Sequence, residues 1–316
     1  MSIYDVNGKS VSEWFDIEGN KMGSYFDIHG NEYNKQPPVA VGDLVVMSFN
    51  VLRWDGSYAL SARSRVNDVF SAITTEFDGH SPDVVGFQEY KNTPLALGGG
   101  ETITVENFLA EDYGLVNVEH SAVYSDATGI FLATASKYAL DDAECVQYLT
   151  EARDLYQKMY IAFGGKRIAI FNTHLNYTAR DFTEYRYRQI KKLFEEAAKE
   201  EYFIIMGDLN TFDCTSTGSD TYIAMLKQFV DAGYHLANCS DENGFHYTHN
   251  SGGDIDGDPA GTWNYLDHII TSGNITINKV YVDETKLGFK EKYPNLQNVS
   301  IVIDHLPIVA HLTVYA

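Results

Sequence analysis

The 316-residue chain has few cysteines, little positive charge and no long apolar run. The three cysteines, Cys145, Cys214 and Cys239, are widely spaced and lack a CxxC pattern, so they indicate neither a disulfide framework nor a thiolate zinc site. No stretch approaches 18 consecutive apolar residues, and the first residues contain no apolar signal segment. We therefore expect a soluble protein without stable membrane insertion. Two locations are open: the cytoplasm, or secretion with a signal that is absent from this sequence.

Lysine and arginine number 23 against 44 aspartates and glutamates, giving a formal net charge of −21. Such a chain repels nucleic acids and anionic membranes on average, which argues against tight non-specific DNA binding. A nuclease is not excluded, because a divalent cation in an acidic site reverses the local field that a phosphodiester meets. The hydrophobic fraction of 44% is sufficient for a large core.

Residues 4–31 contain an 11-residue repeat whose copies begin at Tyr4, Phe15 and Phe26. Each copy reads aromatic-Asp-aliphatic and then X-Gly, which predicts strands entering tight hairpin turns. We expect a small β-hairpin extension and linker over residues 1–38 and one catalytic domain over residues 39–316. Attachment, self-association, weak cation binding and a purely structural role are all open for the repeats, and we favour simple attachment or a structural role.

Beyond residue 42, short buried strands alternate with amphipathic helices, which is typical of an α/β domain. We expect helices at 63–77, 101–111, 182–200 and 221–230. The expected strands are 44–49, 84–87, 115–118, 129–133, 158–163, 166–171, 203–206, 263–270, 275–282 and 308–314. Gly98–Gly100 has no phosphate-binding frame around it and predicts a flexible loop.

Polar side chains follow several of these strands. The strand at 203–206 leads through Gly207 to Asp208 and Asn210, and the strand before it ends at His174. These two strands bracket one helix, so His174 and Asp208 could reach the same edge of a sheet. A carboxylate and a carboxamide there could orient a water and hold a phosphate oxygen, although Gly-Asp and Asn-Thr are also ordinary turn formers.

Six short motifs occur in a fixed order: MSFNV, PDVVGFQE, FNTHL, IMGDLN, LDHI and IDHLPI. Their order and approximate spacing resemble the endonuclease/exonuclease/phosphatase superfamily, the deoxyribonuclease-like fold, over Leu44 to Leu312. Each motif alone is weak, whereas six in order are specific. The resemblance implies a four-layer α/β sandwich of two facing mixed β-sheets with outer helices, and an active site where strand-end loops meet at one edge.

The resemblance also implies a metal site. It makes Glu89 the principal ligand, with Asn50 alongside and Asp304 nearby. An oxygen-rich set of few ligands suits Mg²⁺ or Mn²⁺, which keep several waters and bind the substrate phosphate directly.

The remaining roles implied by the resemblance concern phosphate and proton handling. His174 and Asn210 resemble donors to the phosphate oxygens, which would stabilise charge in the transition state. Asp208 resembles the residue that orients or deprotonates the attacking water. His305 resembles a general base or a charged phosphate contact, and Asp267 the carboxylate that orients it. The division of labour between Asp208 and His305 is open.

Two other features have competing interpretations. Arg153 resembles a position with which family nucleases grip a flanking phosphate, but a lone arginine before a strand is also typical of a solvated surface. Asp254, Asp256 and Asp258 resemble half of a calcium loop, yet Tyr265 stands where its last glutamate would be, so we favour a solvated turn.

Three histidines and one substitution complete the set. His246 and His249 are expected in a loop near the mouth of the site, in reach of substrate. His268 follows Asp267 directly, points to the other face of its strand and is left out of the site. Ile303 replaces the serine usual in the family, which puts local hydrogen bonding in question.

The function that we expect is metal-dependent hydrolysis of a phosphodiester by in-line attack of water, with DNA or RNA as the leading substrate. A phosphatase or phosphodiesterase acting on a small phosphoester or phospholipid, similar to sphingomyelinases or phosphoinositide phosphatases, is the alternative. The loops at Gly98–Gly100 and Asn238–Trp263 would set that choice. A catalytically inactive binding protein on the same fold is the third possibility.

Overall fold

The computed structural model describes residues 38–52, 63–92, 94–122, 129–148, 155–176, 182–211, 220–237, 240–241, 244–245, 248–250, 263–282 and 305–316. The chain divides into two units, Met1–Ala40 and Val41–Ala316. The predicted hairpin repeats and nearly all of the proposed linker lie outside the described residues, so that part of the domain division stays a prediction.

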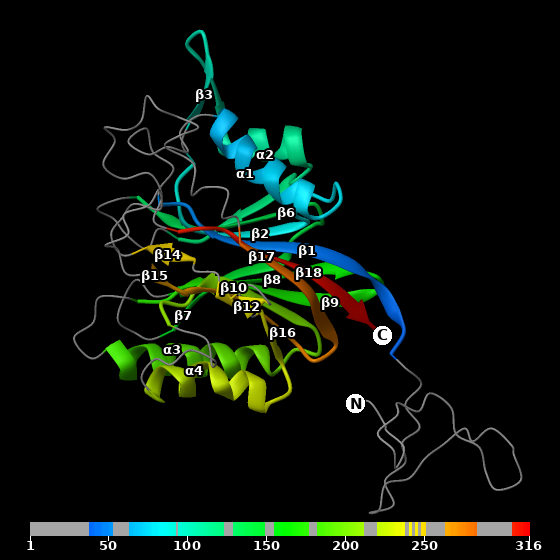
Figure 1. Ribbon diagram of the computed structural model, residues 1–316, viewed down its shortest axis with the longest axis vertical. Helices are drawn as coiled ribbons and strands as arrows, with labels where there is room; N and C mark the ends of the chain where they lie inside the picture. Colours follow the sequence, from blue (N-terminus) through cyan, green and yellow to red (C-terminus); the bar gives the residue numbers. More distant parts are fainter. Residues whose placement is uncertain are drawn as a thin grey trace, which may run out of the picture. The chain divides into compact units, whose positions relative to one another are not determined.

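Two mixed six-stranded sheets face each other in the second unit (Figure 1). The first sheet has the order β17-β18-β1-β2-β6-β5. Its strands are β1 (Ala40–Asn50), β2 (Val84–Tyr90), β5 (Asn117–His120), β6 (Phe131–Ser136), β17 (Ile275–Val282) and β18 (Ile308–Tyr315). β1 and β2 run parallel, whereas β2 with β6, β5 with β6 and β17 with β18 are antiparallel.

The second sheet has the order β11-β16-β10-β9-β8-β7. Its strands are β7 (Asp141–Gln147), β8 (Leu155–Phe163), β9 (Lys166–His174), β10 (Phe203–Asp208), β11 (His235–Leu236) and β16 (Asp267–Thr271). β9 and β10 run parallel, and β8 joins β9 through a turn in which Gly164 and Gly165 have φ of +56° and +76°. A Gly-Gly pair between two strands is typical of such a hairpin.

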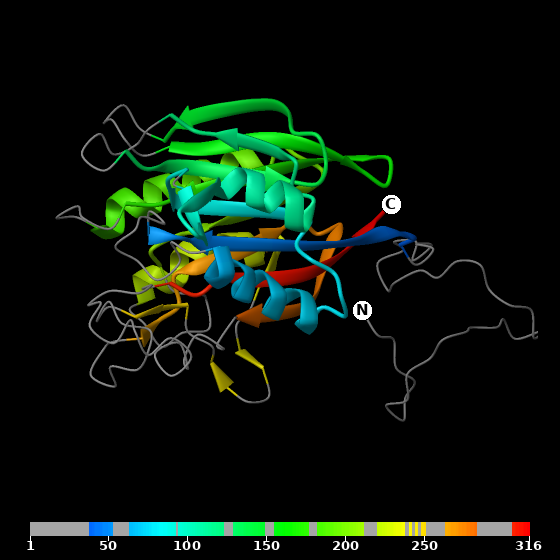
Figure 2. The same ribbon diagram turned by 90° about the horizontal axis from the view of Figure 1, so that it is seen from above.

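Helices cover the outer faces of both sheets. α1 (Arg63–Glu76) and α2 (Val105–Tyr113) lie on the first sheet, and α3 (Phe182–Ala197) and α4 (Asp220–Asp231) on the second (Figures 1 and 2). α1 buries Val66, Val69, Phe70 and Ile73 at the spacing that the sequence predicts. The four-layer sandwich predicted from the sequence is therefore confirmed.

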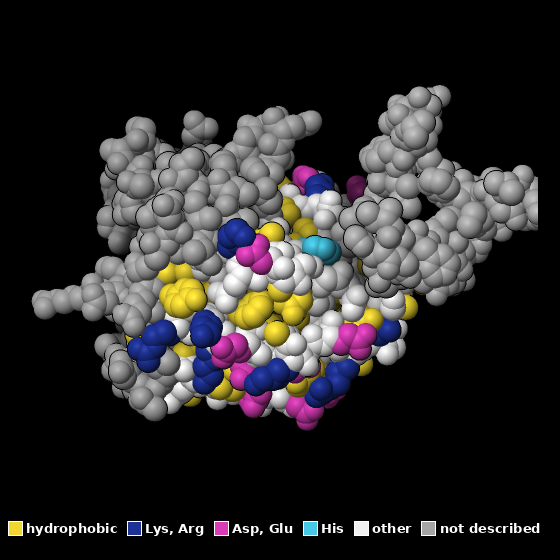
Figure 3. All heavy atoms as spheres, turned by 90° about the horizontal axis from the view of Figure 1, so that it is seen from below, with side chains coloured by type: hydrophobic (Ala, Val, Ile, Leu, Met, Phe, Trp, Pro, Cys, Tyr) yellow, Lys and Arg dark blue, Asp and Glu magenta, His cyan; other side chains and the backbone are white. Residues whose placement is uncertain are grey.

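The outer face of α3 and α4 carries charges of both signs, interspersed with hydrophobic side chains (Figure 3). Lys191 pairs with Glu195 on α3, and Lys227 pairs with Asp231 on α4. Such exposed pairs contribute little to stability. None of the described helices is both long and apolar enough to cross a membrane.

The two sheets approach closely at Gly86 of β2. A Cβ atom added there would lie 3.1 Å from the Met206 Cβ and 3.2 Å from the Asn172 Cγ, both on the second sheet. Asn172 lies at the centre of a buried polar layer: its Nδ2 donates to the carbonyl oxygen of Ala133 (2.9 Å), and its Oδ1 accepts from the Gln88 Nε2 (2.8 Å). Hydrogen bonds therefore join the sheets directly beneath the strand ends.

Several predicted element boundaries were wrong. Residues 101–111 are not one helix: Glu101–Thr104 is β4, paired with β3 (Pro94–Gly98), and α2 begins at Val105 after the Thr104 cap. Gly98–Gly100 thus forms the tip of a hairpin. Residues 263–270 are also two strands, β15 (Trp263–Asn264) and β16. The predicted strand at 84–87 continues through Glu89, which matters for the site.

The segment at 238–263, expected to be polar loop, contains further short strands. They are β12 (Ser240–Asp241), β13 (Gly244–Phe245) and β14 (His249–Asn250). β12 pairs with β13, and β14 pairs with β15. β14 also reaches the site, because His249 forms an antiparallel bridge with His305.

Candidate active site

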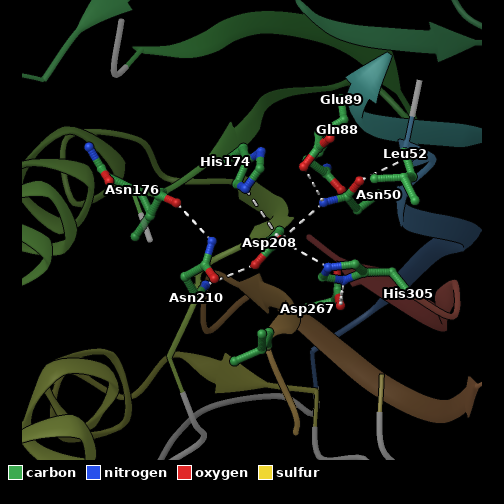
Figure 4. Close-up of polar contacts among 12 residues, drawn as sticks. Asn50, Leu52, Gln88, Glu89, His174, Asn176, Asp208, Asn210, Asp267 and His305 are labelled. Carbon is green, nitrogen blue, oxygen red and sulfur yellow. Dashed lines mark hydrogen bonds and ion pairs between the residues drawn. The ribbon is translucent and has the colours of Figure 1, made fainter. Parts of the chain in front are cut away.

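Strand register brings the predicted site residues of the second sheet together. Asp208 at the end of β10 lies opposite His174 of β9 on one side and opposite Asp267 of β16 on the other. β10 can lie this close to β9 because residue 207 is glycine: a Cβ there would be 2.4 Å from the Thr173 carbonyl oxygen. Three neighbouring strands thus each deliver one titratable side chain to a single edge (Figure 4).

Asp208 is the centre of this cluster. Its Oδ2 accepts from the Asn50 Nδ2 at 3.2 Å and lies 3.4 Å from the His174 Nε2 and 3.5 Å from the His305 Nε2. Its Oδ1 accepts the backbone N–H of Asn210 at 2.9 Å. Burial alone would raise the pKa of Asp208, but the two imidazoles and these hydrogen bonds hold the pKa below its usual value. The side chain is therefore a buried carboxylate that stays ionised.

His305 and Asp267 form a dyad beside Asp208. The His305 Nδ1 lies 2.8 Å from the Asp267 Oδ2, which leaves its Nε2 directed toward Asp208. Burial raises the pKa of Asp267 to about 6. The charge of Asp208 also raises this pKa, whereas His305 lowers it. This arrangement fixes the orientation of the imidazole, with its Nε2 3.5 Å from the Asp208 Oδ2.

A short segment holds the dyad from the side. The Thr248 hydroxyl accepts hydrogen bonds from the backbone N–H groups of Leu266 (3.0 Å) and Asp267 (3.1 Å). The Thr248 carbonyl oxygen accepts a hydrogen bond from the backbone N–H of Leu306 (2.7 Å). The ring of His249 lies 4.6 Å from that of His305, centroid to centroid. One segment thus contacts both members of the Asp267–His305 dyad.

Glu89 reaches the site from the first sheet through an irregular backbone. The register between β2 and β6 shifts between Phe87 and Tyr90, which is a β-bulge, and Glu89 has a φ of +50°. A left-handed conformation at a residue other than glycine costs about 1–3 kcal/mol and persists only where surrounding structure holds it. The Asn50 Nδ2 lies 3.5 Å from the Glu89 Oε1, so Asn50 links Glu89 to Asp208.

Asn210 is the second site residue with a positive φ, +48°. Its side-chain Nδ2 donates to the Leu175 carbonyl oxygen at 2.8 Å. This contact ties the second residue after β10 to the first residue after β9. An amide nitrogen carries two hydrogens, so one remains for a phosphate oxygen.

The donor set can accommodate a divalent cation. Glu89 and Asp208 both direct a carboxylate oxygen at the Asn50 amide nitrogen, and a cation would satisfy the same two carboxylates more strongly. A second group is formed by Asp208, Asp267 and His305, whose donor atoms lie within 4.8 Å of one another. In that group Asp267 is already engaged by the His305 Nδ1, whereas Glu89 offers a purely oxygen-based partner.

Seven of the predicted site residues converge in the described part of the chain, and two do not appear there. Asp304 and Arg153 lie outside the described residues, as do Ile303, His246, Asp254, Asp256 and Asp258. His268 is buried, with its Nε2 2.7 Å from the Thr211 carbonyl oxygen. Sequence reasoning missed the roles of Gln88, Thr248 and Asn172, although Gln88 directly precedes Glu89 within a recognised motif.

A model of the endonuclease/exonuclease/phosphatase family matches residues 47–294, more than half of the chain. The chain belongs to this family. Members of the endonuclease/exonuclease/phosphatase family hydrolyse phosphoesters, and the buried Asp/Asp/His group of this chain is consistent with their typical dependence on divalent metals. No curated protein sequence matches the chain.

Solved structures of the family share the fold. An endonuclease/exonuclease/phosphatase from Beutenbergia cavernae is 17% identical, with a TM-score of 0.58 over 87% of this chain and 72% of that one. TDP2 of D. rerio, complexed with single-strand DNA product, is 17% identical, with a TM-score of 0.58 over 85% and 98%. ANGEL2, a 2′,3′-cyclic phosphatase complexed with adenosine-2′,3′-vanadate, is 15% identical, with a TM-score of 0.53 over 86% and 96%.

Proposed function

We propose that this chain is a Mg²⁺- or Mn²⁺-dependent phosphodiesterase that cleaves nucleic acid by in-line attack of water. The observation that carries the proposal is the convergence on Asp208 of two imidazoles and the Asn50 amide, which connects it to Glu89. An ionised carboxylate between histidines is suited to orient a water, and an adjacent acid-paired imidazole is suited to accept its proton. Both tasks concern the attacking water.

Roles follow from the electrostatics. Asp208 has a depressed pKa, so it is a weak proton acceptor and serves mainly to orient the attacking water. His305 accepts the proton at its Nε2, while Asp267 holds its Nδ1–H and stabilises the imidazolium that forms. The water oxygen bonds to phosphorus as the ester oxygen on the opposite side leaves, and no covalent enzyme intermediate forms.

Phosphate stabilisation falls to the other polar groups. His174, which lies close to Asp208 and is largely buried, and Asn210 would donate hydrogen bonds to the non-bridging oxygens, on which charge increases in the transition state. Glu89 and Asn50, with Asp304 from outside the described residues, would hold the cation. The cation, when bound, neutralises phosphate charge and polarises the phosphorus–oxygen bond.

Nucleic acid is favoured as substrate by two related structures. The TDP2 structure contains a single-strand DNA product, and the ANGEL2 structure contains an adenosine-2′,3′-vanadate. The net charge of −21 favours a weakly held substrate, so cleavage without tight binding is expected. A small phosphoester is the second candidate, since a compact ligand carries fewer negative charges than nucleic acid and is repelled less by a chain of this net charge.

The test is hydrolysis of bis(p-nitrophenyl) phosphate and nicking of supercoiled plasmid, each with Mg²⁺, Mn²⁺ or EDTA. Glu89→Ala should abolish both activities, and Glu144→Ala, which removes an exposed carboxylate on β7, is the matched control. Metal-dependent nicking that only Glu89→Ala removes supports the nuclease. Cleavage of the small diester with intact plasmid assigns a small phosphoester, and inactivity on every phosphoester offered would favour a binding protein.

A further inference from the structure

The β-bulge in β2 decides which way Glu89 points. In a regular strand, side chains alternate between the two faces. Gly86 faces the second sheet, so Phe87 faces outward and Gln88 inward, as observed from the contact of Gln88 with Asn172. Strict alternation would then send Glu89 outward, toward the layer of α2, and would bring Tyr90 inward.

The opposite arrangement is found. Tyr90 packs on the same outer face as Phe87, with ring centroids 5.5 Å apart, although the two residues are three positions apart. Between Phe87 and Tyr90 the strand contains one residue more than the facing segment of β6, from Ala133 to Phe131. The additional residue is accommodated at Glu89, which has a positive φ. As a result, the Glu89 carboxylate points into the site and not outward.

Tyr90 is firmly held on the outer face. Its side chain is 1% exposed, and its ring stacks on His120 at 5.8 Å and packs against Phe131 at 5.4 Å. The Tyr90 hydroxyl donates to the Glu106 Oε1 at 3.4 Å, and the same oxygen lies 2.9 Å from the His120 Nε2. Groups from α2, β5 and β6 therefore surround one ring.

The inner face of the bulge is held as well. The Asn172 Nδ2 donates to the carbonyl oxygen of Phe87 at 3.2 Å, and the Gln88 Nε2 donates to that of Gly86 at 3.1 Å. The Gln88 carbonyl oxygen in turn accepts the backbone N–H of Val51, directly after Asn50. The strained residue is thus held by its neighbours on both sides.

We propose that Tyr90 is a positioning residue for Glu89: by packing on the outer face of β2 it holds the bulge that turns the Glu89 carboxylate toward a divalent cation. This inference rests on the proposed metal-binding role of Glu89. Without the aromatic ring, the strand relaxes toward regular alternation and the binding-competent conformation becomes a minority. The apparent affinity for the cation is proportional to the fraction of molecules in the binding-competent conformation. If that fraction falls to about one tenth, the cation binds about tenfold more weakly.

The experiment measures Mn²⁺ binding to the full chain by calorimetry, without substrate. Tyr90→Leu removes the ring, Tyr90→Phe removes only the hydroxyl, and His120→Ala removes a half-exposed stacking partner. Phe70→Leu is the matched control, because it also removes a fully buried aromatic ring from the first sheet's core but lies on α1. Glu89→Ala identifies the heat that belongs to the site.

We expect Tyr90→Leu to bind Mn²⁺ about tenfold more weakly, His120→Ala to change affinity in the same direction, and Tyr90→Phe and Phe70→Leu to bind like the wild type. Wild-type affinity in both Tyr90→Leu and His120→Ala overturns the positioning role and leaves the metal assignment intact. If Tyr90→Leu does not fold, His120→Ala alone decides. Wild-type binding in Glu89→Ala overturns the metal assignment itself, and with it this inference.

Discussion

The free energy of unfolding of Asp267→Asn, minus that of the wild type, should be larger at neutral pH than at acidic pH. The substitution should also remove most of the activity. Asp267 is fully buried, and its pKa is raised from 3.8 to about 6. A difference of about two pH units corresponds to about 3 kcal/mol, which is the unfavourable free energy of keeping this carboxylate ionised in the fold. Asparagine removes the charge and retains an oxygen that can accept the His305 Nδ1–H.

The sign follows from proton binding. Between pH 3.8 and about 6 the folded wild type binds a proton at Asp267 that the unfolded chain has released, so its stability falls as the pH rises through this window. Asparagine does not titrate. The free energy of unfolding of the variant, minus that of the wild type, should therefore increase by up to about 3 kcal/mol between pH 4 and pH 7.

A constant offset acts in the other direction. The Asp267 Oδ1 is buried without a hydrogen-bond partner among the described residues, and an amide group placed there leaves a buried N–H₂ unsatisfied, at a cost of about 1–3 kcal/mol. The offset does not depend on pH, so it does not contribute to the change in stability between pH 4 and pH 7. Asp208 behaves in the opposite sense, because its pKa is lower in the folded protein than in the unfolded chain. It stabilises the fold at pH values above its unfolded pKa, and this stabilisation is lost as the pH falls.

The assay is urea unfolding of both proteins at several pH values from 4 to 7 in EDTA, since a bound cation would add its own linkage. Asp231→Asn, which makes the same chemical change on the exposed face of α4, is the control. Turnover of Asp267→Asn at pH 7 should fall at least about 10²-fold. If the difference in the free energy of unfolding between variant and wild type is the same at pH 4 and at pH 7, the raised pKa of Asp267 is refuted. Unchanged turnover would refute a catalytic role for the Asp267–His305 dyad.

Three further outcomes are expected. Thr248→Val should lower the free energy of unfolding by about 2 kcal/mol, because one buried and one partly buried N–H group lose their acceptor, and should also lower turnover. Thr248→Ser keeps the hydroxyl, so stability in urea unfolding and turnover in steady-state assays should both stay at the wild-type values. Asp208→Asn should reduce turnover at least about 10²-fold with its secondary structure intact by circular dichroism, and near wild-type rates would contradict its role. Deleting residues 1–38 should leave turnover on bis(p-nitrophenyl) phosphate unchanged, and a loss of turnover in a folded protein would place the repeats in the site.

Local sequence patterns predicted an α/β domain and the polar residues at its strand ends for a physical reason, whereas the four-layer sandwich was predicted from the family resemblance. Strand, helix and turn patterns are local, and short polar motifs after apolar runs such as that at Phe203–Met206 locate the functional edge. The same reasoning missed β7, which is exposed along nearly its whole length and has no hydrophobic alternation. It also ended β2 at Phe87, because the bulge depends on where Tyr90 packs among distant residues.

The supporting groups of the site were hidden for the same reason. Thr248 acts on Asp267 from 19 positions earlier in the chain, through one hydroxyl group that no local pattern distinguishes from a surface threonine. Asn172 lies two residues before His174 and looked like part of its motif, yet its side chain turns inward and binds the opposite sheet. Such roles depend on which strands face each other across the core.

The hydrogen bond from Asn50 to Asp208 crosses between the two sheets. Glu89 and Asn50 belong to one layer, and His174 and Asp208 to the other. The distance between the layers therefore sets the distance between the residues proposed to hold the cation and the residue proposed to orient the water. A change of about 1 Å would break a hydrogen bond of this length. Heating or chemical denaturant that loosens the packing of one layer on the other should consequently inactivate the protein while both sheets still retain their own backbone ladders.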